Sequence, residues 1–522
     1  MVSAVSLFRP VALSLREIAG DEYLAAACAA RAWLSGESAE ELQTLASRPV
    51  DFYPEALQRR LTSLLPRVGE QVLPQPLVKS ARGAATERFR AATHTEAAPI
   101  SGLGYYRIGE DGRLYLLTKS EHYHAPLGHA FPGYQLIEYA KRLGIPNATH
   151  NNTRGHLTRL LEERLVAAAN GIQESDHAAL ATTLAQTSPT VLNRVLNLET
   201  GSLVAEAALK MILARFYIVQ EDTPPPVYRG RVPVALVMGN DEGGLHANYH
   251  GTTTLTQCLR GMWPEIGAIC RQAGLLEVCP LRPNSIEDLE AAFRRYEQPP
   301  YKIAGFFHEL VMMNYGGRLL SREFLRRAYE LCAAHDVPTI VDEIQTGIWS
   351  SELFLFREFG LTPSIVAVGK GFPGGEYPAS RLLCSAAIDN LPQFGALVTN
   401  GQEELASLAY LITMRWVQAN AEPIARIGDY YEVQLREFAA RYPERITSVT
   451  GYRQLAGIAF TALPEAREFV ARLNRRGFDI SAQTYKADCP PVVLTKIPLI
   501  ADNATVDHIL AAMDAAMTER ES

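Results

Sequence analysis

Two stretches of this chain, Val337-Pro-Thr-Ile-Val-Asp342-Glu-Ile-Gln-Thr-Gly347 and Ile365-Val-Ala-Val-Gly-Lys370-Gly-Phe-Pro-Gly-Gly375, share one pattern. Each is a short run of β-branched and apolar residues that ends in a polar residue and glycine. This pattern is typical of a buried parallel strand that presents a side chain at its carboxyl end. Two such strand ends can face one ligand, and here they would present Asp342 and, 28 positions later, Lys370.

An aspartate and a lysine at such an edge predict pyridoxal 5′-phosphate as a cofactor. A desolvated lysine holds some neutral amine and can form a Schiff base with the aldehyde of this cofactor. An aspartate can pair with its protonated pyridine nitrogen. The alternative is that both residues are ordinary charges that cap two core strands, as is common in α/β proteins. The remaining motifs must distinguish between these interpretations.

The composition indicates a large globular protein. Of its 522 residues, 47% are hydrophobic and 20% charged, which is enough for a large core and for two or three domains. A net charge of −7 and a pI near 6.0 provide no broad basic surface, so we expect no nucleic-acid partner and no membrane partner. The seven cysteines lack CxxC spacing and the first residues lack a signal-peptide pattern, which favours a cytoplasmic location.

Hydrophobic periodicity divides the chain into four parts. Residues 1–95 predict a helical N-terminal extension, and residues 96–190 predict the first part of a small domain, beginning with a hairpin over Tyr105–Leu117. Residues 191–415 alternate helices with short apolar strands. This alternation predicts a large α/β domain that binds the cofactor and whose mostly parallel sheet is covered by helices on both faces. Residues 416–522 predict a smaller α+β domain.

Two further motifs could serve the same cofactor. Thr200-Gly-Ser202 precedes a strong helix former, and the free amides at a helix start can bind a phosphate. The alternative is an ordinary helix cap. Tyr249-His250-Gly251 places an aromatic ring beside a flexible loop, where it could stack on a pyridine ring, although such a pair can also serve packing alone.

Together, these motifs resemble the class III pyridoxal-phosphate-dependent aminotransferases of the fold type I superfamily, over roughly residues 100–515. The most specific parts are Asp342-Glu-Ile-Gln-Thr-Gly347 and Gly369-Lys-Gly371, at the separation usual in that family. Weaker parts follow in the family's order: Leu127-Gly-His129, Thr200-Gly-Ser202 with Glu206-Ala-Ala208, Tyr249-His-Gly251, Phe307-His-Glu309 with Gly316-Gly317, and Thr399. The resemblance implies the fold type I architecture and a homodimer that builds each site from both chains.

The resemblance also implies roles for individual residues. Lys370 would form the Schiff base and move a proton between substrate and cofactor, while Asp342 would keep the pyridine nitrogen protonated. Gln345 would contact the ring hydroxyl, and Tyr249 would stack on the ring. The other residues implied to bind the cofactor are Gly201 and Ser202 at the phosphate, Thr399 from the neighbouring subunit, His250 and Glu309.

Departures from the family pattern concern the substrate. The segment Glu309–Gly317 keeps the family's first glutamate but lacks the second, and no clear match exists for the C-terminal arginine that often binds a substrate carboxylate. Ile348-Trp-Ser-Ser351 stands where the family usually has a turn containing Gly-Arg. We therefore hypothesise that carboxylate recognition is rebuilt, and the candidate cations are Lys486, Arg453 and Arg154. The alternative for each is a solvated surface cation.

The predicted function is amino-group transfer between an amine or amino acid and a keto acid or aldehyde, by a ping-pong Schiff-base mechanism. No metal is expected, because His122, His124 and His129 lie around a turn and not on one helix face. Two alternatives stay open. One is a racemase, epimerase or aminomutase on the same fold, since no amino-acceptor site is evident. The other is a noncatalytic binding or scaffold protein.

Overall fold

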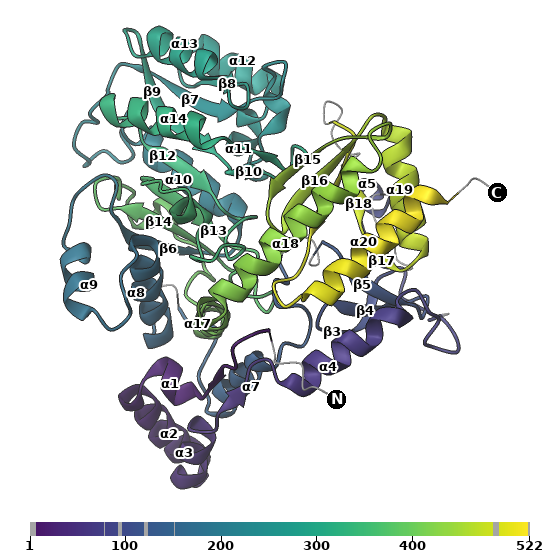
Figure 1. The fold of residues 1–522 in the computed structure, drawn as a ribbon. Coiled ribbons are helices and arrows are strands. Elements are labelled where there is room, and N and C mark those ends of the chain that lie inside the picture. Colours follow the sequence, from purple (N-terminus) through teal and green to yellow (C-terminus); the bar gives the residue numbers. More distant parts are fainter. Residues whose placement is uncertain are drawn as a thin grey trace.

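The computed structural model describes residues 7–77, 79–91, 97–119, 124–150, 152–483 and 490–519. Its largest sheet has seven strands in the order β6, β14, β13, β12, β9, β7 and β8 (Figure 1). Their bounds are β6 Leu192–Leu198, β7 Val232–Met238, β8 Glu277–Leu281, β9 Tyr301–His308, β12 Thr339–Asp342, β13 Ile365–Val368 and β14 Ser380–Ser385. Only β14 runs antiparallel to its neighbours in this sheet. The predicted mostly parallel sheet is therefore confirmed.

Both faces of this sheet are buried. Along β7, Val234 and Leu236 join one apolar core, whereas Ala235 and Val237 join a second core on the opposite face, as the two-residue period of a strand requires. Helix α10 supplies side chains to the second core, and helices α14 and α17 supply side chains to the first. The bounds of these helices are α10 Gly201–Leu213, α14 Arg322–Ala334 and α17 Glu404–Ala419. Burial on both faces explains why the strands read as continuous apolar runs.

The C-terminal part forms a second, antiparallel sheet in the order β15, β16, β19 and β18 beside the large one (Figure 1). Its elements are α18 Ala421–Ala440, β15 Ile446–Tyr452, β16 Leu455–Phe460, α19 Leu463–Arg475, β18 Ser481–Ala482, β19 Val492–Lys496 and α20 Asn503–Thr518. The predicted boundary at residue 415 falls inside α17. The division into four domains therefore stays a prediction.

A third sheet joins distant parts of the chain. Strand β17 (Phe478–Asp479) pairs in parallel with β5 (Leu114–Leu117), which pairs in turn with β4 (Tyr106–Gly109) and β3 (Pro99–Leu103). The predicted hairpin is confirmed as β4 and β5. Because β5 pairs with β17, the strands between Pro99 and Leu117 form one sheet with a strand from the C-terminal part of the chain.

The N-terminal residues form mostly helices, and the first of these lie at the bottom of Figure 1, where α7 (Gln135–Arg142) packs against α1 and α3. Its elements are β1 Ala12–Leu13, α1 Leu15–Ala19, α2 Asp21–Ser35, α3 Ala39–Ala46, β2 Val50–Asp51 and α4 Glu55–Leu64. Phe8 packs its ring 5.4 Å from that of Trp416 on α17, and the Tyr53 hydroxyl donates to the Ile500 carbonyl over 3.1 Å. The extension is thus anchored to both larger parts of the chain.

The remaining α-helices and strands complete the described fold. They are α5 Glu87–Ala91, α7 Gln135–Arg142, α8 His156–Asn170, α9 His177–Leu184, α11 Thr254–Leu259, α12 Pro264–Gln272, α13 Ile286–Tyr296, β10 Val311–Met312, β11 Arg318–Leu319, α15 Leu355–Glu358 and α16 Gln393–Ala396. Within the described ranges, none of the helices combines the length and the apolar character needed to cross a membrane.

Candidate active site

A cavity of about 510 Å³ lies at the edge of the large sheet where β12 and β13 end. Asp342 is the last residue of β12, and Lys370 comes two residues after β13. Because parallel strands end at the same edge, the side chains that follow them open into one space. Both residues line the cavity, so the structure brings together the pair on which the sequence argument rests.

Lys370 lies on a tightly packed loop. A Cβ atom on Gly369 would lie 2.3 Å from the Ser380 hydroxyl, and one on Gly371 would lie 2.6 Å from the Trp349 ring, so glycine is required on both sides of the lysine. Burial lowers the pKa of Lys370, and the negative charges of Asp342 and Glu309 oppose that shift. A lowered pKa increases the fraction of neutral amine near pH 7, which is the form that attacks an aldehyde.

Asp342 is paired with the imidazole of His250. The distance between Asp342 Oδ2 and His250 Nδ1 is 2.9 Å, and Asp342 Oδ1 accepts a bond from the Ile344 amide over 3.1 Å. His250 is only 2% exposed, yet its Nε2 has no hydrogen-bond partner in the part of the chain that the structure describes. A buried carboxylate at a cavity wall suits a cationic ring nitrogen, and an unsatisfied buried imidazole nitrogen suits a polar ligand.

The start of α10 forms a second wall of the cavity. Thr200, at the N-cap, makes no side-chain capping bond, and Thr200, Gly201 and Ser202 line the cavity at the N-terminal end of the helix. Gly251, with a φ of +117°, passes so close that its Cβ would lie 2.8 Å from Ser202 Cα. Open amides at the positive end of a helix fit a phosphate dianion.

The other predicted residues fall into two groups. Gln345, Tyr249 and His250 line the same cavity as Lys370. The Arg260 guanidinium lies 5.0 Å from the centre of the Tyr249 ring and covers it. Glu309 is buried and does not line the cavity, but its negative charge opposes the lowering of the Lys370 pKa by burial. Thr399 is exposed in a turn and is not among the residues that line the cavity.

Sequence reasoning missed several residues near this site. The cavity is also lined by His124, Glu199, Ile344, Tyr377 and Ser380. Two buried lysines, Lys119 and Lys496, lie close enough to Lys370 that its positive charge lowers the pKa of each. Part of the pattern was present for both, because each ends an apolar run, as Leu-Leu-Thr-Lys119 and Val-Leu-Thr-Lys496. The amide of Lys496 donates to the Thr118 carbonyl over 2.7 Å, so these two strand ends meet.

Lys119 is expected to make the stability of the cofactor-free protein depend on pH. Burial lowers the pKa of Lys119 from 10.5 to about 8, against the opposing charge of Asp479. Between these two values the unfolded chain binds the proton and the folded chain does not. The free energy of unfolding should therefore rise with pH in this window, by roughly 1.4 kcal/mol per unit from this one group. We expect Lys119→Met to remove that rise.

Urea denaturation of both proteins at pH 8, 9 and 10 measures this difference. Lys141→Met is the matched control, because Lys141 is an exposed lysine paired with Glu138. If the free energy of unfolding changes with pH by the same amount in wild type and in Lys119→Met, the assignment of a lowered pKa to Lys119 is wrong.

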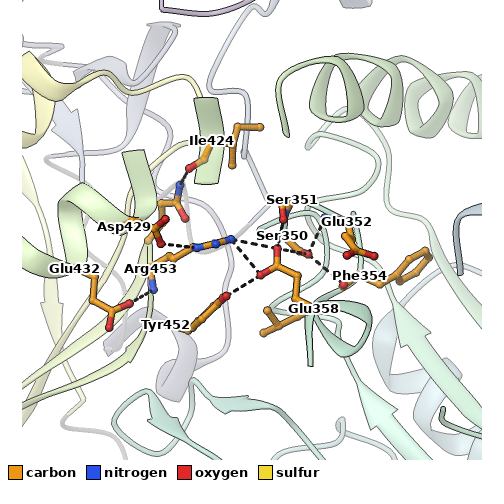
Figure 2. Close-up of polar contacts among 12 residues, drawn as sticks. Ser350, Ser351, Glu352, Phe354, Glu358, Ile424, Asp429, Glu432, Tyr452 and Arg453 are labelled. Carbon is orange, nitrogen blue, oxygen red and sulfur yellow. Dashed lines mark hydrogen bonds and ion pairs between the residues drawn. The ribbon is translucent and has the colours of Figure 1, made fainter. Parts of the chain in front are cut away.

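Arg453, a predicted substrate cation, instead joins the C-terminal sheet to the large domain (Figure 2). Its guanidinium binds Glu358 at 3.0 Å and Asp429 at 2.8 Å, and its amide donates to Glu432. The side chains of Arg453 and Glu358 are 17% and 7% exposed. Glu358 also accepts bonds from Tyr452, Ser350 and Ser351. Arg453 does not line the cavity, and its positive charge is balanced within this network.

The two other predicted substrate cations also receive no structural support. Arg154 is about half exposed and forms an ion pair with Glu162. It is not among the residues that line the cavity. Lys486 lies outside the described residues. No group of three or more metal-binding side chains occurs within the described ranges, which include His124 and His129 but not His122.

Comparison with known proteins supplies the family. The profile of the class III aminotransferases matches residues 150–517. The chain belongs to the class III aminotransferase family. Class III aminotransferases use pyridoxal 5′-phosphate, so the predicted family and cofactor are both confirmed, and the donor set described above fits that cofactor.

Individual aminotransferases match only parts of the chain in sequence. Aminotransferase PigE of a Serratia species is 27% identical over 318 residues, which are 57% of this chain and 33% of that protein. The acetylornithine aminotransferase of Aquifex aeolicus is 24% identical over 224 residues, which are 42% of this chain and 57% of that enzyme. The matched region thus spans between a third and a little over half of these curated relatives.

The likeness in structure extends further. The ornithine aminotransferase of Toxoplasma gondii superposes with a TM-score of 0.63 and 20% sequence identity, covering 84% of this chain and 97% of that one. At this identity the superposition shows the fold alone. It confirms the predicted fold type I architecture.

Proposed function

We propose that this protein is a pyridoxal-phosphate-dependent aminotransferase, which moves an amino group between an amine or amino acid and a keto acid or aldehyde. The observation that carries the proposal is the meeting of Lys370, Asp342 and the open start of α10 around one cavity. Each of these three features fits a different part of the same cofactor: its aldehyde, its ring nitrogen and its phosphate. A binding module would have no evident need for all three.

Within this proposal, the phosphate is bound by the first-turn amides of Gly201 and Ser202. Asp342 pairs with the pyridine nitrogen, and His250 holds the Asp342 carboxylate in place through the bond at 2.9 Å. Gln345 approaches the ring hydroxyl. When bound, pyridoxal phosphate supplies the electron sink that stabilises negative charge at the substrate α-carbon.

Lys370 has two tasks in this scheme. Its neutral amine, favoured by burial, holds the cofactor covalently. With a substrate amine in place, the same Nζ would be the group that accepts the proton from the substrate α-carbon and later returns it. The carboxylates of Asp342 and Glu309 moderate its lowered pKa, so Nζ can both accept and release a proton.

We also propose a homodimer in the cytoplasm. The exposed turn that carries Thr399 lies away from the cavity of its own chain, which suits a contact with a neighbouring subunit. Light scattering during gel filtration would contradict the dimer if it gave the mass of one 57.5 kDa chain.

The cysteines that the structure describes as free thiols are consistent with a reducing compartment: Cys28, Cys258, Cys270, Cys279, Cys332 and Cys384.

An absorbance experiment tests the proposed function. The purified protein with added pyridoxal phosphate should show a visible band, which an amino donor should bleach and a keto acid should restore. The panel of amino donors includes simple amines, ornithine and acetylornithine. The last two are included because they appear in the names of similar proteins. A band that no donor bleaches, with product formed in the absence of an acceptor, would favour an isomerase. The absence of any band would overturn the proposal.

A further inference from the structure

Lys496 reaches from the C-terminal sheet into the segment that follows Asp342. It is the last residue of β19 and is fully buried. Its Nζ donates to the main-chain carbonyl of Gln345 and lies 3.5 Å from the centre of the Trp349 ring. The Trp349 indole nitrogen donates in turn to the carbonyl of Ile497 over 3.2 Å. The last residue of β19 and the residue after it therefore hold both ends of the Gln345–Trp349 segment.

A lysine is a costly choice at this position. Burial lowers the pKa of Lys496 well below its usual range, and the positive charge of Lys370 adds to that shift. Methionine would fill a similar volume without burying a polar amine. What methionine could not supply is the bond to the Gln345 carbonyl and the contact of an amine with the Trp349 ring. These contacts explain why an amine lies in this part of the core.

The segment that Lys496 holds carries residues of the proposed cofactor site. Ile344 and Gln345 line the cavity, and the Ile344 amide binds the Asp342 carboxylate. The carbonyl that accepts the bond from Lys496 belongs to Gln345 itself. A shift of this main chain would therefore move the Gln345 side chain and one of the two bonds that orient Asp342.

We propose that Lys496 is a positioning residue, which fixes the main chain of Gln345–Trp349 and thereby sets the Gln345 and Asp342 side chains toward the cavity. The inference rests on the proposed function, because it assigns these two side chains to the cofactor. It also makes the geometry of the site in the large domain depend on the placement of the C-terminal sheet.

The chain offers a matched control at the other end of the same connection. Arg453, between β15 and β16, forms an ion pair with Glu358. Glu358 is the last residue of α15, the helix that follows the Gln345–Trp349 segment. Both contacts join the same two parts of the molecule, but only Lys496 contacts Gln345. Arg453→Met should lower the unfolding midpoint, because it leaves the buried Glu358 carboxylate without its cation. Lys496→Met loses a hydrogen bond but also exchanges a costly buried amine for an apolar side chain, so its unfolding midpoint is not a measure of the positioning role. Only Lys496→Met should disturb the cofactor site.

Hydrogen exchange of the cofactor-free protein tests the main-chain effect. In Lys496→Met, the amides of residues 344–349 should exchange about tenfold faster than in wild type, as expected for the loss of one hydrogen bond to an amine. In Arg453→Met, faster exchange should be confined to residues 350–358. Unchanged exchange over 344–349 in Lys496→Met would overturn the proposal. If that variant does not fold, Trp349→Phe removes the indole bond to Ile497 and part of the ring that Lys496 contacts, and it should raise exchange in the same amides.

Cofactor binding tests the consequence for the site. Lys496→Met should weaken binding of pyridoxal phosphate by about tenfold and shift its visible band, Arg453→Met should do neither, and Lys496→Arg should restore part of the loss. Equal binding by wild type and Lys496→Met would overturn the positioning role. If wild type itself gives no band, the proposed function fails, and the exchange experiment still decides whether Lys496 holds the segment.

Discussion

Replacing Lys370 with alanine is expected to abolish the visible band of bound pyridoxal phosphate and to lower the rate of amino transfer by at least about 10³-fold. The reason is that Lys370 has two tasks, covalent attachment of the cofactor and movement of the proton, and alanine can perform neither. The described residues that line the cavity contain no second lysine that could replace it. Absorbance spectra and rates with a donor identified in wild type measure both losses.

Two further variants make this result specific. Lys370→Met fills the volume of the lysine and should behave as Lys370→Ala, which separates the loss of the amine from the loss of packing. Lys141→Ala removes an exposed lysine paired with Glu138 and should keep both the band and the rate. A visible band that persists in Lys370→Ala would show that another amine holds the cofactor, and the proposed site would be wrong.

Asp342→Asn is expected to have the second largest effect. The variant keeps the shape of the side chain but removes its charge, so the pyridine nitrogen loses its anionic partner and His250 loses a charged hydrogen-bond acceptor. Breaking such a buried pair costs about 3–5 kcal/mol, which corresponds to a fall in rate of about 10²-fold to about 5 × 10³-fold if the loss is confined to the transition state. Steady-state rates at saturating donor measure the effect.

Asp342→Asn should also lower the pKa of Lys370. The charge of Asp342 raises the pKa of Lys370, so its removal should lower that pKa further. In the cofactor-free protein, the neutral amine of Lys370 should then persist to lower pH, and chemical labelling of Lys370 should begin at lower pH. Asp336→Asn, at the opposite end of β12, is the control and should change neither the rate nor the labelling profile. Activity in Asp342→Asn within a few-fold of wild type would remove Asp342 from the mechanism.

The strand-end pattern predicted much of this site. It placed Asp342 and Lys370 at one edge because a buried parallel strand has a local signature, which needs only a few consecutive residues. Lys119 and Lys496 also follow apolar runs, each directly after a threonine, but no glycine follows either lysine as the pattern requires. The pattern therefore does not predict these two lysines, and only their buried positions in the fold bring them near Lys370.

The sequence pattern could not choose among the candidate substrate cations, and Lys486 stays a prediction because it lies outside the described residues. The local sequence around an arginine in a loop does not show whether its side chain faces a cavity, solvent or a carboxylate of the same protein. Arg453 is paired with Glu358, 95 positions earlier in the chain, and with Asp429 on α18. Neither partner could be read from the residues around Arg453, because both pairs form only when separate elements of the fold come together.

The amino-acid sequence determined the family, the mostly parallel sheet and the pairing of an aspartate with a lysine at the sheet edge, because each follows from short-range patterns of apolar, polar and glycine residues. The tertiary structure alone decided which cations are buried, paired or near the cavity. Lys496 contacts Gln345 and Trp349 across about 150 positions of chain, and its amine is buried only because the C-terminal sheet docks on the segment after β12. Burial and charge pairing depend on such long-range contacts, which no local pattern encodes.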